Sequence, residues 1–154
     1  MKKAAALIML ICFSFLLFAC SNNNYSVPER YDYVKKVNFK KHPVNLSGTL
    51  PEVGKPAPIF NLVKSDLATL SLEDLKGKTL VLNIFPSLDT GVCATSVRKF
   101  NQLASNMKDT LVLAISKDLP FAHSRFCTTE GIDNLIPLSD FRATSFSTDY
   151  GLLM

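Results

Sequence analysis

The stretch that decides the fold runs from Thr79 to Cys93 and reads TLVLNIFPSLDTGVC. Its first seven residues are an apolar run too short for a buried helix, so residues 79–85 are predicted to form a strand covered on both faces, as in parallel sheets. Pro86 ends this strand. Apolar positions spaced three and four residues apart then predict an amphipathic helix over Gly91–Met107.

The alternation of strand and helix continues towards the C-terminus. A second strand is predicted at Leu111–Ile115, and a helix at about Pro120–Glu130 that Gly131 ends. A weaker strand follows at Leu135–Leu138, where Pro137 favours an edge of the sheet. Residues 142–150 have helical character. The pattern predicts an α/β fold with right-handed crossovers.

Shorter elements are expected before this core. Loose alternation over Lys36–Leu46 predicts a hairpin, and Ile59–Val63 follows a turn-rich segment as a short strand. The residues from Ser71 to Asp74 resemble a helix-capping arrangement, and Gly77 closes the single turn that they begin.

Composition limits the remaining choices. A chain of 154 residues has room for one domain, and 47% hydrophobic against 19% charged residues argues against disorder over the whole length. The six Gly and eight Pro show no repeat, which excludes collagen-like and solenoid architectures. A formal net charge of +4, two units of which come from Lys2 and Lys3, gives no support to nucleic-acid binding.

The first nineteen residues are predicted to be a signal peptide. A basic start precedes an apolar run that is shorter than a membrane-spanning helix requires. The sequence Leu17-Phe18-Ala19-Cys20 resembles a bacterial lipobox, so we expect lipidation of Cys20 and residues 20–35 as a lipidated tether. The expected location is the bacterial cell envelope, with the domain lipid-anchored to a membrane on its extracytoplasmic side. An uncleaved signal anchor is the alternative.

Two cysteines then remain for chemistry. Of four in total, Cys12 leaves with the signal peptide and Cys20 takes the lipid, so Cys93 and Cys127 are left as a pair. The sequence has no Cys-x-x-Cys, which argues against a disulfide reductase. A zinc site is also disfavoured, because only His42 and His123 could join the pair as ligands.

The loop after the first strand places Cys93 in the first turn of the next helix. Free backbone N–H groups and the helix dipole favour a thiolate there. Thr90 can place a hydroxyl beside the sulfur or a bound oxygen, and Pro86 can form a wall of the pocket. The alternative is that Cys93 is a small apolar residue on a helix face.

The motif Pro86-x-x-x-Thr90-x-x-Cys93 resembles the peroxiredoxin active site. The longer string from Asn83 to Asn101, together with Asp118–Ala122, Ser124–Cys127 and Leu138–Arg142, is similar to the bacterial thiol peroxidases, which are atypical two-Cys peroxiredoxins of the thioredoxin-like superfamily. The resemblance covers roughly residues 36–151. It implies a thioredoxin-like fold with an N-terminal β-hairpin and an enzyme that needs no cofactor or metal.

The same resemblance assigns roles to the cysteines. Cys93 would be the peroxidatic thiolate that attacks hydrogen peroxide or an organic hydroperoxide and becomes a sulfenic acid. Cys127 would resolve it as an intramolecular disulfide, with Thr90 and Pro86 as further catalytic residues and a thioredoxin-like dithiol as reductant. Each helix would have to unwind locally around its cysteine. Homodimers form among relatives, so the resemblance also implies a second copy of the chain as a partner. A permanent structural disulfide is the alternative for the pair.

The chain also departs from this family. Its members continue beyond the position of Gly151 with a hairpin, a last helix and an active-site arginine, so residues 36–154 are expected to be an incomplete redoxin domain whose first central strand lies at a bare edge. An inactive truncated remnant or structural envelope lipoprotein is therefore one alternative function. A thioredoxin-like disulfide oxidoreductase is another.

Overall fold

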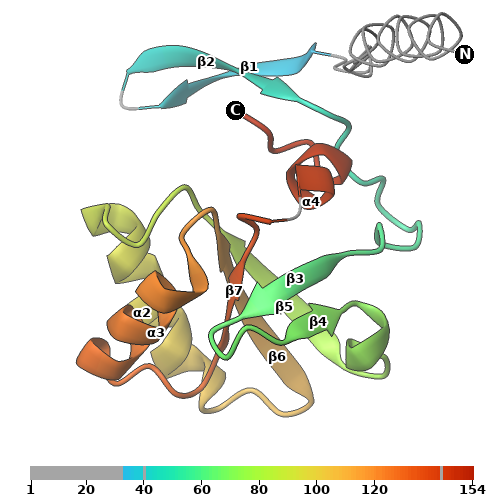
Figure 1. Ribbon diagram of the computed structural model, residues 1–154. Coiled ribbons are helices and arrows are strands. Elements are labelled where there is room, and N and C mark those ends of the chain that lie inside the picture. Colours follow the sequence, from blue (N-terminus) through green and yellow to red (C-terminus); the bar gives the residue numbers. More distant parts are fainter. Residues whose placement is uncertain (1–32, 40, 143) are drawn as a thin grey trace, which may run out of the picture. The chain divides into compact units, whose positions relative to one another are not determined.

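The computed structural model describes residues 33–39, 41–142 and 144–154 (Figure 1). The predicted signal peptide, Cys20 and nearly all of the predicted tether lie outside the described residues. Within the described part, every helix is too short or too polar to cross a membrane.

A five-stranded mixed sheet forms the centre, in the order β4-β3-β7-β6-β5. The strands β5 (Thr79–Ile84), β6 (Thr110–Ser116) and β7 (Ile136–Ser139) run parallel. The strand β3 (Asn61–Lys64) pairs antiparallel with both β7 and β4 (Thr69–Ser71). Among the described strands, β5 pairs with β6 alone, so it lies at an edge of the sheet, as expected.

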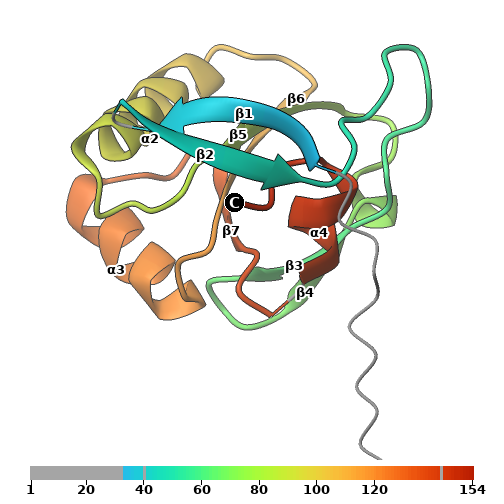
Figure 2. The same cartoon turned by 90° about the horizontal axis from the view of Figure 1, so that it is seen from above.

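The helices lie on opposite faces of this sheet. Both α2 (Gly91–Ala104) and α3 (Pro120–Glu130) lie on one face, and α4 (Thr144–Asp149) lies on the other (Figures 1 and 2). Successive side chains of β6 point to opposite faces of the sheet. Val112 and Ala114 pack beneath α2 and α3, whereas Leu113 and Ile115 pack on the α4 side.

The core on the α4 face combines aliphatic side chains with three aromatic rings. The rings of Phe146 and Tyr150 lie 4.5 Å apart between centroids, and Phe60 meets Phe146 edge-on at 5.7 Å. The Tyr150 hydroxyl donates to the Pro58 carbonyl at 2.9 Å, so the polar end of this buried ring is also satisfied.

The predicted N-terminal hairpin is confirmed. The strands β1 (Tyr33–Phe39) and β2 (His42–Ser47) pair antiparallel, and Lys41 in their turn has a φ of 69°. The hairpin is joined to the C-terminal segment by a hydrogen bond of 2.7 Å from the Ser47 N–H to the Leu153 carbonyl.

The capping arrangement predicted at Ser71 is also confirmed. The Ser71 N–H donates to the Asp74 carboxylate at 2.9 Å, while the Asp74 N–H donates to the Ser71 hydroxyl at 3.3 Å. This reciprocal pair begins a single 3₁₀ turn, η1 (Glu73–Leu75).

The predicted edge position of the 135–138 strand is wrong. The strand β7 lies between β3 and β6, near the middle of the sheet. Pro137 is tolerated there because pairing with β3 begins one residue later, at Leu138, so its missing N–H does not interrupt that ladder.

Candidate active site

The loop after β5 carries Cys93 into α2. The Phe85 N–H donates to the Ile115 carbonyl at 3.1 Å, which extends the parallel ladder one residue past the strand. Thr90 is the N-cap residue of α2, with extended backbone, and its carbonyl accepts the Ala94 N–H at 3.0 Å. Cys93 is therefore in the first turn of the helix, as predicted, and it is half-buried.

The hydroxyl of Thr90 points back into its own loop. It donates to the Ser87 carbonyl at 3.0 Å, and the Thr90 N–H reaches the same carbonyl at 3.2 Å. Because its only proton is used in this bond, the Thr90 oxygen faces any bound molecule as an acceptor. A hydroperoxide, which carries an O–H donor, is a molecule of matching chemistry.

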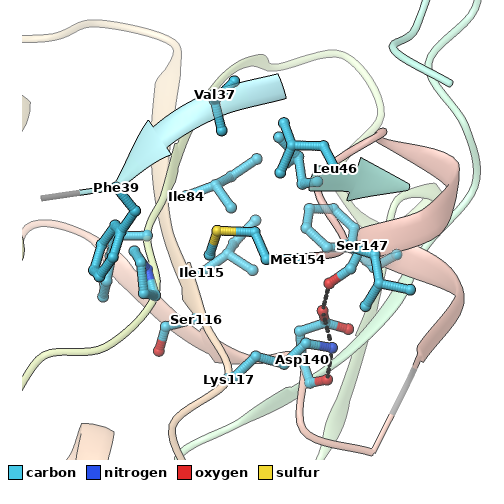
Figure 3. Close-up of a pocket in the computed structure, with 15 residues that line it drawn as sticks. Val37, Phe39, Leu46, Ile84, Ile115, Ser116, Lys117, Asp140, Ser147 and Met154 are labelled. Atoms are coloured by element: carbon cyan, nitrogen blue, oxygen red, sulfur yellow. Dashed lines mark hydrogen bonds and ion pairs between the residues drawn. The ribbon is translucent and has the colours of Figure 1, made fainter. Parts of the chain in front are cut away.

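Pro86 lines a cavity of about 420 Å³ that lies between the hairpin, the end of β5 and the C-terminal segment. Figure 3 shows apolar side chains around Met154, with Lys117, Asp140 and Ser147 gathered along one side. The predicted role of Pro86 as a pocket wall fits this position. Neither Cys93 nor Thr90 lines this cavity, so the structure does not bring the three loop residues together around it.

Cys127 lies in the last turn of α3. Its carbonyl accepts the N–H groups of Gly131 and Ile132, and Gly131 has the left-handed φ of 63° that closes the helix. Burial raises the pKa of the Cys127 thiol above its ordinary value. Both Cys93 and Cys127 are free, on two different helices.

Two polar contacts join α2 to the end of α3. Arg98 forms a two-pronged ion pair with Glu130, with both N···O distances at 2.8 Å, and its guanidinium lies 5.7 Å from the centre of the Phe126 ring. The buried Asn101 accepts the N–H groups of Asp133 and Asn134 at 3.1 and 2.8 Å. The C-terminal end of α3 is thereby fixed to the helix that carries Cys93.

A carboxylate just beyond the neighbouring strand β6 holds the Cys93 loop. Asp118 accepts hydrogen bonds from the Ser87 hydroxyl at 2.8 Å and from the Leu88 N–H at 2.7 Å. It also accepts the hydroxyl proton of the buried Ser116 at 2.8 Å. Asp118 therefore has three donors, two of which belong to the loop.

His123 is almost fully buried beside this network. Its Nε2 lies 3.0 Å from the Ser116 oxygen. Because the Ser116 proton is given to Asp118, Nε2–H is the donor in this pair. Burial lowers the pKa of His123, and the negative charge of Asp118 opposes that shift. Across the described residues, no group of three or more His, Cys, Asp or Glu side chains could hold a metal ion.

Comparison with known proteins identifies the family of the chain. The redoxin family model matches residues 52–154. A thiol peroxidase of Corynebacterium glutamicum is 54% identical over 119 residues, which are 77% of this chain and 72% of that protein. A thiol peroxidase of Listeria monocytogenes is 49% identical over the same length. The chain belongs to the bacterial thiol peroxidases of the redoxin family.

Solved structures share the fold of this thiol peroxidase. A peroxiredoxin-like protein from Aquifex aeolicus matches with a TM-score of 0.71 and 39% identity, covering 77% of this chain and 69% of that one. A thiol peroxidase from Chromobacterium violaceum shares the fold, with a TM-score of 0.66 at 21% identity over 79% of this chain and 69% of that one. The α/β, thioredoxin-like fold class predicted from the sequence is confirmed.

The sequence did not reveal three residues that shape the site of this thiol peroxidase. Asp118 was visible only as one letter of a matching block, and Arg98 and Asn101 likewise. The loop and helix-end residues that they bind are 30 to 33 residues away along the chain. The signal that could have found Asp118 is its position just beyond β6, because carboxyl ends of parallel strands meet at one edge of a sheet.

Proposed function

We propose that this thiol peroxidase reduces hydrogen peroxide and organic hydroperoxides through Cys93, with Cys127 as the resolving cysteine. The Cys93 thiolate attacks the terminal peroxide oxygen. An S–O bond forms, the O–O bond breaks, and the alkoxide or hydroxide that leaves takes up a proton. Cys93 becomes a sulfenic acid and the peroxide becomes an alcohol or water.

The second step closes a disulfide. The Cys127 sulfur, as a thiolate, displaces hydroxide from the Cys93 sulfenic acid, and protonation of that hydroxide gives water. A thioredoxin-type dithiol then reduces the disulfide and is itself oxidised. Cofactor chemistry is not required in this cycle.

One observation carries the proposal: two free thiols lie in the terminal turns of two helices on the same face of the sheet. Terminal turns unwind more easily than helix interiors, because fewer hydrogen bonds hold them. The acceptor oxygen of Thr90, three residues before Cys93, supplies a partner for the O–H of a hydroperoxide.

The test uses the purified, reduced full chain and one equivalent of hydrogen peroxide. We expect rapid formation of a Cys93–Cys127 disulfide, detected by peptide mass spectrometry. The Cys127→Ser variant should still consume peroxide once and leave a dimedone-trappable sulfenic acid on Cys93, whereas Cys93→Ser should not react. A chain that melts cooperatively but gives no Cys93 oxidation would support the inactive structural alternative. Oxidation of a protein dithiol without peroxide would support the oxidoreductase alternative.

We also propose that the chain is anchored in the bacterial cell envelope through a lipid on Cys20. The basic start, the short apolar run and the lipobox-like sequence support this anchor. Growth with radiolabelled palmitate should label the wild-type chain and the Cys12→Ala variant, while Cys20→Ala should be unlabelled and soluble. Equal labelling of all three would overturn the anchor.

Light scattering of the purified chain tests the homodimer that the family resemblance implies.

A further inference from the structure

The active-site loop is tied to a single carboxylate that lies just beyond the next strand of the sheet, β6. Asp118 follows β6 by two residues, and its Oδ1 accepts the Ser87 hydroxyl while its Oδ2 accepts the Leu88 N–H. The Leu88 side chain is buried in the core beneath α2 and α3. The loop is therefore fixed at two successive residues, by polar contacts outside it and by packing below it.

These contacts are passed along the loop to Cys93. The carbonyl of Ser87 accepts both the N–H and the hydroxyl of Thr90. The Thr90 carbonyl accepts the Ala94 N–H and begins α2. A shift of Ser87 would therefore move the acceptor oxygen of Thr90 and the first turn of α2, in which Cys93 lies.

Asp118 is itself held by residues of the neighbouring strands. Its N–H donates to the Ser116 oxygen at 3.2 Å, and its carbonyl accepts the hydroxyl of Ser139, a buried residue of β7, at 2.6 Å. The His123 ring donates to the same Ser116 oxygen. The carboxylate is thus supported by β6, β7 and α3, which are regular elements of the core.

We propose that Asp118 is a positioning residue for peroxide reduction: it holds the Pro86–Thr90 loop so that Thr90 and Cys93 meet the peroxide in a reactive geometry. This inference rests on the proposed function of Cys93. Asp118 touches neither the substrate nor the reacting sulfur in the proposed step, and it acts through Ser87 and Leu88.

The chemistry of the three donors requires a carboxylate. Alanine at position 118 would remove every acceptor and leave the Leu88 N–H without its partner. Asparagine keeps one acceptor oxygen, which can take the Leu88 N–H, while its amide faces the Ser87 hydroxyl, which can turn to accept. The Asp118→Asn variant should therefore keep part of the function that Asp118→Ala loses.

The test compares two reactions of Cys93 in the full-length chain. Attack on hydrogen peroxide needs the oriented loop, whereas alkylation by iodoacetamide needs only an accessible thiolate. For Asp118→Ala we expect the peroxide rate to fall by about 10- to 100-fold, while the alkylation rate of Cys93 changes by less than about threefold. Asp118→Asn and Ser87→Ala should lower the peroxide rate by about three- to tenfold. Asp109→Asn, at an exposed carboxylate paired with Lys78, is the matched control and should react as the wild type does.

The outcomes separate the two proposals. If the wild-type chain melts cooperatively but Cys93 does not react with peroxide, the proposed function fails, and the role of Asp118 fails with it. If the wild type reacts and the Asp118 variants react equally fast, the positioning role alone is wrong. Equal losses in the peroxide and alkylation rates would indicate a purely structural carboxylate and would also overturn it. Where Asp118→Ala lacks a cooperative melt, Asp118→Asn and Ser87→Ala decide between these results.

Discussion

The guanidinium of Arg98 and the carboxylate of Glu130 meet edge to edge, each donor nitrogen facing its own oxygen at 2.8 Å. This pair joins the helix of Cys93 to the last residue of the helix of Cys127. Arg98 holds the pKa of Glu130 below its ordinary value, so the pair persists in mildly acidic solution. Any unwinding of the last turn of α3 has to break it.

Removing this ion pair should speed the resolving step. In the Arg98→Met and Glu130→Gln variants, we expect the Cys93–Cys127 disulfide to form about two- to fivefold faster after a pulse of peroxide, because surface ion pairs contribute only modestly. Less Cys93 should then be over-oxidised to sulfinic acid at excess peroxide. Rapid quenching followed by peptide mass spectrometry measures both. Lys78→Met, which removes the distant pair with Asp109, is the control. Unchanged disulfide rates in all variants would show that the Arg98–Glu130 pair does not restrain the resolving step.

Cys127 should behave as a protected thiol in the folded, reduced chain. Because burial raises its pKa, the neutral thiol is the stable form, and its contribution to stability is full below the ordinary value of 9.0 and is lost as the pH rises above it. Pulse alkylation from pH 6 to pH 10 should label Cys127 more slowly in the folded chain than in urea, with the difference narrowing above about pH 9. Equal labelling of folded and unfolded chains at pH 8 would contradict this.

His123 should make the fold sensitive to mild acid. Burial lowers its pKa, so the unfolded chain binds a proton more readily, and stability that is present above the ordinary value of 6.5 is lost as the pH falls below it. Melting temperatures between pH 5 and pH 8 should fall towards the acid end for the wild type. His123→Gln should flatten this slope, while His42→Gln, at an exposed position, should keep it. A slope that survives in His123→Gln would assign it to other groups.

The buried carboxylate of Asp140 should depend on Lys117. The Lys117 ammonium lies 2.6 Å from Asp140 Oδ2 and 3.0 Å from its carbonyl, and the Ser147 hydroxyl also donates to this carboxylate. Lys117→Met would leave the carboxylate of Asp140, a residue that is 2% exposed, with the Ser147 hydroxyl as its donor. This change should lower the free energy of unfolding by about 1–3 kcal/mol in urea titrations.

Two further variants check this prediction. The double variant Lys117→Met/Asp140→Asn should recover part of the loss, because it removes the buried charge as well. Lys64→Met, which breaks an exposed pair with Asp66, should leave the urea midpoint unchanged. A single variant as stable as the wild type would show that water already compensates Asp140.

Local patterns made most of the elements predictable. The strand at residues 79–85 and the helix at Pro120–Glu130 were identified because periodicity, Pro86 and Gly131 all act within a few residues. The helix predicted over Gly91–Met107 ends earlier, at Ala104, because its last residues form turns instead. Strand order was less accessible: Pro137 suggested an edge, but the neighbours of a strand are set by distant parts of the chain.

The same distinction applies to the site. Pro86, Thr90 and Cys93 lie within eight residues, so a short motif could identify them. The contacts that hold them do not lie in the motif: Ser87 and Asp118 are 31 residues apart, and Arg98 and Glu130 are 32 apart. Pairs at such separation leave no periodicity in a single sequence, and only the folded sheet brings them together.

In the proposed cycle, the two cores on opposite faces of the sheet would undergo different changes. The proposed unwinding of the ends of α2 and α3 would disturb the packing of Cys93 and Phe126 on one face, while the contacting rings of Phe60, Phe146 and Tyr150 would stay untouched on the other. The sheet thus separates the α2/α3 face, whose packing changes in this cycle, from the α4 face, whose packing does not. Amide exchange should record that division, with fast exchange in the helix ends and long-lived protection behind the sheet, so that each catalytic cycle starts again from the same folded template.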